Sequence, residues 1–207
     1  MNYFLSLILS IPGLFMALSI HEFAHGYAAY LMGDNTAKYN GRLSMNPLAH
    51  LDIAGTLCLL LFHFGWAKPV PINPFNFRDR QKGIIIVSLA GPFANFVLAI
   101  VCTVCYKLLG NFVYGSQIAE FFYMIFLYAA AMNVGLMVFN LIPIPPLDGS
   151  KVLMEFLPDR FRYQMYNLER YSGIILLLLV WTNVLTPVLA TMRNWVYALI
   201  DMITFFI

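Results

Sequence analysis

The feature that most constrains this chain is a series of long apolar runs that few charges interrupt. The runs at 3–31, 83–109, 117–141 and 172–192 each hold about the 20 residues that an α-helix needs to cross a bilayer. Only 11% of the 207 residues are charged, whereas a soluble domain carries about 25%. A soluble fold would need a polar surface that this composition lacks. We therefore expect an all-α polytopic membrane protein, a bundle of about four to five transmembrane helices.

The basic residues indicate how the chain is oriented in the membrane. Three loops hold ten of the twelve Lys and Arg residues, namely Lys38, Arg42, Lys68, Arg78, Arg80, Lys82, Lys151, Arg160, Arg162 and Arg170. The positive-inside rule places all three loops in the cytoplasm, so the N-terminus is expected outside. The net charge of +2 is small and does not suggest nucleic-acid binding.

The apolar run at 51–66 does not fit this orientation as a simple span. The loops before and after it both carry positive charge, so the run crosses twice or not at all, and its 16 residues are too few to cross twice. We expect a re-entrant or buried segment, which is tolerated where protein or water satisfies its backbone. The following KPVPIN, at 68–73, is typical of an extended, β-like stretch because proline disfavours helix.

HEFAH at 21–25 places three ionisable side chains inside the first apolar run, after nineteen largely apolar residues. In a helix, positions i and i+4 differ by about 40° in azimuth and about 6 Å in rise, so His21 and His25 share a face and can bind one metal ion. Glu22 is turned about 100° from His21, close to any ligand on that metal but poorly placed to bind it. HExxH also occurs by chance, but ionisable groups inside a membrane are costly and functional by default.

A zinc site needs a third protein ligand and an open position. Asp52 and Asp148 both lie near cytoplasmic ends of apolar runs. Asp148 has the stronger context, because the prolines in NLIPIPPLDG (140–149) stop the preceding helix after Asn140, and Gly149 permits a tight turn. The alternative is an ordinary loop aspartate that caps a turn, and chemistry alone leaves it open.

Three motifs, in this order, give the chain a family resemblance. HEFAH (21–25), GPFAN (91–95) and NLIPIPPLDG (140–149) resemble the motifs of the site-2 protease family of intramembrane zinc metalloproteases. GRLSMNPLAHLD (41–52) and FGWAKPVPIN (64–73) resemble the compact prokaryotic branch of that family, which has no PDZ domain. The chain has no room for a PDZ domain either.

The resemblance covers roughly residues 10–155 and implies a set of site residues. It implies that His21, His25 and Asp148 bind one zinc ion per chain. It implies that Glu22 is the general base that activates a zinc-bound water for attack on a peptide bond.

The same resemblance implies that Asn95 and Asn140 lie near the substrate or the oxyanion. Such a donor contributes roughly 3 kcal/mol to catalysis. Asparagine in a membrane helix also often serves only to hold helices together, so both interpretations stay open. His50 and Asp52, which flank the run at 51–66, either support the metal site or cap that segment.

Together these features predict a single transmembrane protease domain over 1–207, with a core at about 3–155 and a C-terminal span and tail at 172–207. Its expected activity is that of a zinc-dependent intramembrane endopeptidase. It would cleave transmembrane segments of other membrane proteins, in regulated intramembrane proteolysis. We expect it in a prokaryotic cell membrane, with the active site toward the cytoplasm, in contact with lipid and a membrane-protein substrate. The sequence carries no signal for the oligomeric state.

Two other functions remain open at this point. A divalent-metal transporter can also carry an HExxH-like pattern, with the glutamate as a ligand, but such carriers have more spans and internal repeats than this chain offers. An inactive homologue that binds membrane partners is the second alternative. For the extended stretch at 68–73, pairing with an unwound substrate as an added strand and an inert edge are equally favoured.

Overall fold

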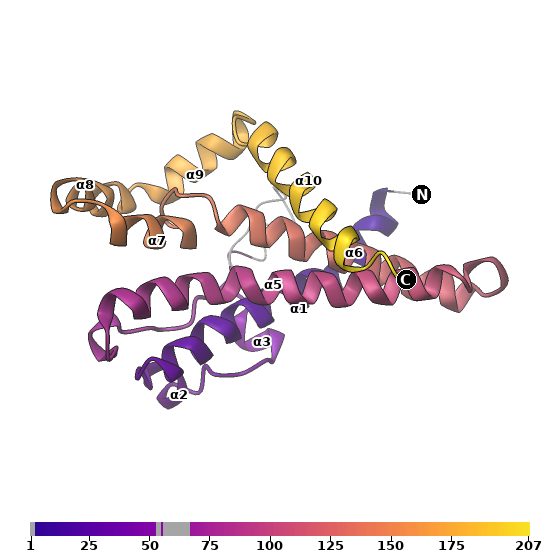
Figure 1. Cartoon of the computed structure of the whole chain (residues 1–207), viewed down its shortest axis with the longest axis horizontal. Coiled ribbons are helices and arrows are strands. Elements are labelled where there is room, and N and C mark those ends of the chain that lie inside the picture. Colours follow the sequence, from indigo (N-terminus) through magenta and orange to yellow (C-terminus); the bar gives the residue numbers. More distant parts are fainter. Residues whose placement is uncertain (1–2, 53–54, 56–66) are drawn as a thin grey trace.

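The computed structural model describes residues 3–52, 55 and 67–207, and this part of the chain is built from helices and contains no named strand (Figure 1). Three helices are long and apolar enough to cross a membrane, namely α1 (Tyr3–Leu31), α5 (Arg80–Gly110) and α6 (Gln117–Asn140). Their bounds agree with the predicted runs at 3–31, 83–109 and 117–141. The prediction of an all-α polytopic membrane protein is confirmed.

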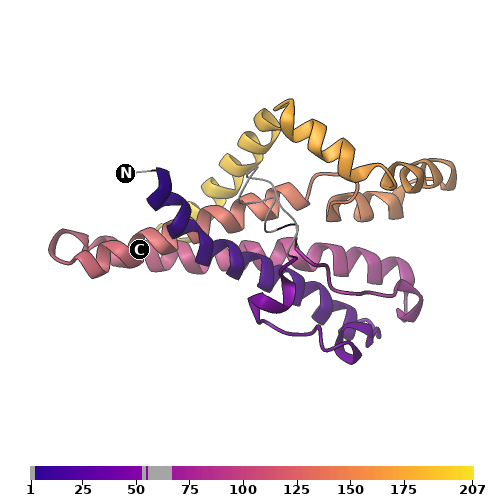
Figure 2. The ribbon, with the colours of Figure 1, turned by 180° about the vertical axis from the view of Figure 1, so that it is seen from behind.

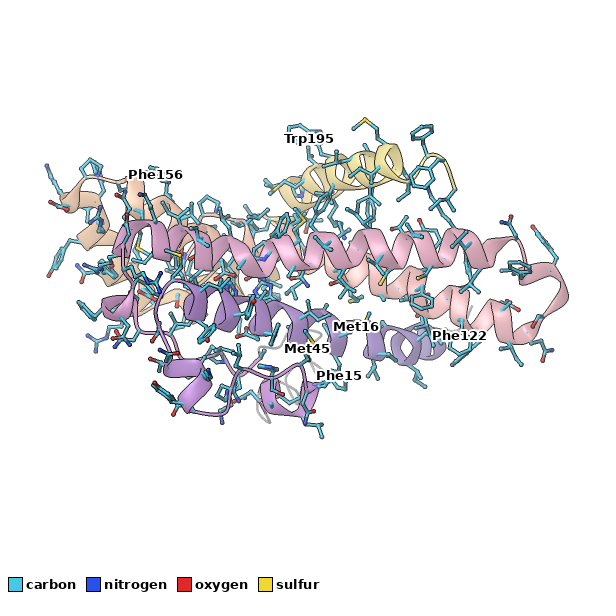
Figure 3. The ribbon with its side chains drawn as sticks, turned by 60° about the horizontal axis from the view of Figure 1, so that its bottom comes forward. Phe15, Met16, Met45, Phe122, Phe156 and Trp195 are labelled. Atoms are coloured by element: carbon cyan, nitrogen blue, oxygen red, sulfur yellow. The ribbon has the colours of Figure 1, made fainter. Side chains whose placement is uncertain are left out.

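The three long helices pack along one another and form the centre of the molecule (Figures 1 and 2). A short turn, η2 (Val113–Gly115), joins α5 to α6, which run in opposite directions. Small residues let α1 approach α6 closely, because a Cβ added to Gly13 would lie 2.6 Å from Ala129 Cα. On the outside of the bundle, large apolar side chains such as Phe122 and Trp195 are exposed (Figure 3), as expected where lipid is the solvent.

One end of the bundle gathers the polar connections. There α1 ends, α5 begins and α6 ends, and the same end carries α2 (Thr36–Tyr39), α7 (Asp148–Phe156) and α8 (Asp159–Glu169) (Figure 1). The extended stretch at 67–73 runs back to this end from α3 (Pro47–His50) and leads into η1 (Pro74–Asn76). A bridge pairs Leu51 with Ala67. Residues 68–73 are not helical, as predicted, and the bridge lies just before them.

The C-terminal part differs from the single span predicted at 172–192. Two helices occupy it, α9 (Ser172–Trp181) and α10 (Thr186–Ile203), and they are bent by 85° at the break between them. Asn183 adopts a φ of 57°, the left-handed conformation that often ends a helix. Pro187 lies in the first turn of α10, where a missing N–H costs nothing. The bent pair adds one span at most to the three long helices.

Two other predicted segments, at 153–171 and 51–66, can be compared with the structure. The mixed-charge stretch at 153–171 has no long apolar run, so its sequence predicts a loop. In the structure it contains the last four residues of α7 and all of α8, which are short amphipathic helices. The re-entrant or buried segment predicted at 51–66 falls almost entirely outside the described residues, which include only 51, 52 and 55 of it.

Candidate metal centre

Two histidines of α1 and an aspartate at the start of α7 converge in the interior. His21 Nε2 lies 3.0 Å from His25 Nε2, and Asp148 Oδ2 lies 3.2 Å and 3.0 Å from these two nitrogens. All three side chains are buried. Among the described residues, no other group of three His, Cys, Asp or Glu side chains converges in this way. The structure thus brings together the three residues that the sequence analysis selected as metal ligands.

The donor set fits a zinc ion. Catalytic zinc sites use three protein ligands, histidine nitrogens and carboxylate oxygens among them, at about 2.0–2.2 Å in a tetrahedral arrangement. Such donors stand roughly 3.3–3.6 Å from one another, which is close to the separations of 3.0–3.2 Å observed here. Three protein donors leave the fourth tetrahedral position open to water or substrate.

Both imidazole rings are held by their second nitrogen. His21 Nδ1 lies 2.6 Å from Asn95 Oδ1, and His25 Nδ1 lies 2.6 Å from the carbonyl oxygen of Val87. Because these oxygens only accept hydrogen bonds, each Nδ1 is assigned as the protonated donor. The lone pairs of both Nε2 atoms are therefore directed at Asp148, which is the tautomer that a metal ligand requires.

A buried chain of amides lies behind His21. Asn95 Nδ2 donates to Ala17 O at 3.0 Å and to Asn133 Oδ1 at 2.8 Å, and Asn133 Nδ2 donates to Ala129 O at 2.8 Å. Both asparagines are fully buried. Since Asn95 has used both amide hydrogens, this geometry favours a supporting role for it, and its predicted oxyanion role stays untested. Sequence reasoning missed Asn133, although an amide within an apolar run was a usable signal.

Gly91 of the GPFAN motif lets α5 approach the histidines. A Cβ added at this position would lie 2.5 Å from His25 Nε2 and 2.6 Å from His21 Cε1, closer than a real Cβ comes. The motif therefore contributes a glycine that makes room for the imidazoles and an asparagine that holds one of them.

Glu22 lies beside the cluster without joining it. Its Oε2 accepts a hydrogen bond of 2.9 Å from the Val70 N–H in the extended stretch. Glu22, the three clustered residues and Asn140 line one cavity of about 640 Å³. Glu22 therefore faces the cavity, as expected, and is not one of the three converging donors.

The end of α6 and the start of α7 bring Asp148 to the histidines. The predicted stop after Asn140 is confirmed, since α6 ends there. The expected role of Gly149 in a tight turn is wrong: it lies in the first turn of α7, and an added Cβ would collide with the Leu141 carbonyl. Lys151, which sequence reasoning missed, places Nζ 3.0 Å from Asp148 Oδ1 and also lines the cavity.

Other candidates lie outside the cluster. Asn140 lines the cavity and donates from Nδ2 to Leu136 O at 3.0 Å, which leaves one amide hydrogen for another acceptor. His50 is buried, with Nε2 2.7 Å from Ser44 O, and Asp52 accepts a hydrogen bond of 2.8 Å from the Gly55 N–H. For Asp52 the capping interpretation therefore fits.

Comparison with known families shows which family the chain belongs to. The model of peptidase family M50 matches residues 9–180, which is most of the chain. The chain belongs to peptidase family M50. The resemblance to site-2 proteases is thereby confirmed.

Individual M50 relatives agree with this assignment. The chain is 37% identical over 185 residues to "Putative zinc metalloprotease YwhC" of Bacillus subtilis, covering 87% of this chain and 84% of that protein. It is 31% identical over 202 residues to "Putative zinc metalloprotease Rip2" of Mycolicibacterium smegmatis, covering 93% and 71%. The Mycobacterium tuberculosis (strain H37Rv) protein of the same name is 26% identical over 199 residues, covering 93% and 71%. No solved structure matches the chain.

Membership of family M50, together with the His–His–Asp donor set, confirms the predictions of a metalloendopeptidase and of zinc as its cofactor. The three long apolar helices make it an integral membrane protein.

Proposed function

We propose that this M50 peptidase cleaves peptide bonds inside the membrane, with His21, His25 and Asp148 holding one zinc ion and Glu22 as the general base. One observation carries the proposal: three buried donor atoms converge between helices long enough to span a bilayer, and Glu22 lines the same cavity without joining them.

Each residue of the cavity has a separate task in this proposal. Zinc, when bound, supplies a Lewis acid that makes water more acidic and polarises a peptide carbonyl. Glu22 takes a proton from the attacking water and passes it to the leaving amine. The free amide hydrogen of Asn140 is available to the oxyanion that forms on the substrate.

The proposed substrate is a transmembrane segment of another protein, locally unwound so that its backbone is accessible. The extended stretch at 67–73 lines the cavity and supports this idea. Of its amides, those of Lys68, Val70 and Asn73 donate within the protein, whereas Ile72 N–H has no partner in the described part of the chain. A substrate strand that pairs with Ile72 would lie beside Glu22.

The distribution of basic residues supports a cytoplasmic location for the site. The metal cluster lies toward the end of the bundle where α1 ends and α6 ends, the end that carries the basic loops (Figure 1). By the positive-inside rule this end faces the cytoplasm of a prokaryotic cell. The proposed protease domain extends over residues 1–207. Besides the substrate, it would contact the surrounding lipid.

The test compares purified wild type, Glu22→Gln and Asp148→Ala in liposomes. Zinc content is measured alongside cleavage of a synthetic single-span peptide that carries a fluorophore and a quencher. One version of the peptide has Asn–Gly–Pro in the middle of its apolar span, and a matched version has an unbroken helix. We expect about one zinc ion in wild type and Glu22→Gln, none in Asp148→Ala, and cleavage of the interrupted peptide by wild type alone.

Three other results would contradict parts of this proposal. Loss of zinc in Glu22→Gln would make Glu22 a ligand and favour the metal transporter. Zinc-loaded wild type that leaves both peptides intact would favour the inactive homologue. Equal cleavage of both peptides would remove the requirement for unwinding.

A further inference from the structure

Arg42, in the stretch that resembles the compact branch of the family, holds the beginning of the extended segment. Its guanidinium donates from Nη2 to Lys68 O at 2.8 Å and to Pro69 O at 3.3 Å, and from Nη1 to Ala49 O. No acidic side chain pairs with Arg42 among the described residues. The charge is instead satisfied by three backbone carbonyls, which ties the 67–73 segment to the end of α3.

Asp34, just after α1, holds the other end of the same segment. Its Oδ2 accepts a hydrogen bond of 2.7 Å from Asn73 N–H, and its Oδ1 accepts one of 2.8 Å from Asn76 Nδ2. Thr36 donates to Oδ1 from both its backbone N–H, at 3.1 Å, and its hydroxyl, at 2.5 Å. The carboxylate is completely buried, so all of its acceptor capacity is directed to these neighbours.

The middle of the segment contacts the proposed base directly. Val70 lies between Pro69 and Pro71, and its N–H donates to Glu22 Oε2 at 2.9 Å. The prolines restrict the backbone on both sides of Val70 to extended conformations. The side chain of Val70 is buried against Gly26, one turn after Glu22, where an added Cβ would lie 3.2 Å from Val70 Cγ1. The position of this N–H therefore defines one hydrogen bond of the Glu22 carboxylate.

We propose that Arg42 and Asp34 are positioning residues, which act on Glu22 through the extended segment between them. Arg42 fixes the carbonyls before Val70 and Asp34 fixes the amide three residues after it, so the Val70 N–H is presented to Glu22 at a fixed place. The proposal rests on Glu22 being the base, as proposed above. Arg42 and Asp34 lie outside the metal site and take no direct part in the zinc chemistry. Under this proposal they act by holding the segment that contacts Glu22.

The proposal predicts what happens to the Val70–Glu22 hydrogen bond when Arg42 or Asp34 is removed. Removal of either charged side chain frees one end, and the Val70 N–H then no longer stays on Glu22. The zinc donors are on α1 and α7 and make no contact with the segment through Arg42 or Asp34. Loss of the clamp is therefore expected to lower kcat while zinc stays bound.

The first measurement is amide hydrogen exchange of peptides covering 67–77, in zinc-loaded protein in detergent. We compare wild type, Arg42→Ala, Arg42→Lys and Asp34→Asn with two control variants on exposed α8, Arg160→Ala and Asp159→Asn. Both Arg42→Ala and Asp34→Asn should accelerate exchange in these peptides, and the controls should not. Arg42→Lys should fall between, because an ammonium group cannot reproduce the planar fork of donors.

The second measurement is cleavage of the interrupted peptide described above. Arg42→Ala should keep its zinc and lose roughly tenfold or more in kcat, with a smaller change in KM, since a displaced catalytic group costs turnover. Guanidinium at millimolar concentration should restore part of the turnover to Arg42→Ala and none to Asp34→Asn, which a general loss of stability would not produce.

Three results would overturn the proposal. They are unchanged exchange in 67–77 for Arg42→Ala, normal kcat despite faster exchange, and loss of zinc in parallel with loss of activity. If wild type itself does not cleave, the catalytic part of the proposal falls with the proposed function. Exchange, which needs no substrate, still reports whether the segment is held.

Discussion

Asn95 Oδ1 on α5 lies 2.6 Å from Nδ1 of His21 on α1, so one helix determines which nitrogen of the other helix faces the metal site. The contact is buried, and the asparagine is itself held by Ala17 and Asn133. Partners of this kind fix the tautomer and ring orientation of metal-bound histidines. Four predictions follow from this and neighbouring contacts.

Asn95→Leu should weaken zinc binding by about 10- to 100-fold, because the acceptor that holds His21 is lost. Asn95→Asp keeps an acceptor for His21 Nδ1 and should weaken zinc binding less than Asn95→Leu does. Competition with a chromogenic zinc chelator measures both, and Asn111→Leu, at the exposed end of the same helix, is the control. Unchanged affinity together with a fall in kcat would instead support the oxyanion role of Asn95.

Gly91→Ala should displace the imidazoles, since its Cβ would lie 2.5 Å from His25 Nε2. We expect zinc affinity to fall at least tenfold. Gly135→Ala is a matched control inside α6, because an added Cβ there meets nothing within 4 Å. Zinc titration of the two variants should separate them, and equal affinities would mean that α5 moves away easily.

Asn140→Ala should lower kcat by about 100-fold or more while zinc content stays at the wild-type level, as for removal of one oxyanion donor. Asn140 lines the cavity, and its Nδ2 donates to Leu136 O rather than to a zinc donor. Single-turnover cleavage of the interrupted peptide measures the effect. Unchanged turnover would leave Asn140 as a residue that only caps the end of α6.

Asp34 should make the fold sensitive to acid. Burial raises the pKa of this carboxyl, but hydrogen bonds from Asn73, Thr36 and Asn76 outweigh burial and hold the pKa below its ordinary value. The ionised form is therefore the one that folding favours. Its stabilising contribution is complete above the unfolded-state pKa of about 3.9 and is lost as the pH falls through the lower folded-state pKa.

The apparent unfolding temperatures of wild type and Asp34→Asn, measured from pH 7 downwards, test this prediction. The difference between the two proteins should be constant at neutral pH and shrink below about pH 4. A difference that grows on acidification would show that the carboxyl folds in its protonated form.

The long helices could be predicted because a bilayer imposes its thickness on the sequence. The runs at 3–31, 83–109 and 117–141 each exceed that thickness, and their ends agree with α1, α5 and α6 within a few residues. Hydropathy was a poorer guide at the C-terminus, where Asn183 and Pro187 divide an equally apolar run into α9 and α10. Polar helices such as α8 carry no comparable signal.

The site was predictable only where its residues form local patterns or known motifs. The i, i+4 spacing of His21 and His25 places both on one helix face, whatever surrounds them. Asn133 and Lys151 were missed because their roles depend on which helix lies opposite them. The N–H of Val70 is a backbone group with no signature of its own.

The sequence by itself therefore determined the membrane environment, the three long helices and the paired histidines, because each follows from composition or from helical periodicity over neighbouring residues. Tertiary structure decided that Asp148 meets the histidines from 123 residues away, that Asn95 and Val87 orient them, and that Arg42 and Asp34 hold the segment beside Glu22. These contacts join residues distant in the chain, and their geometry exists only once α1, α5, α6 and α7 have packed.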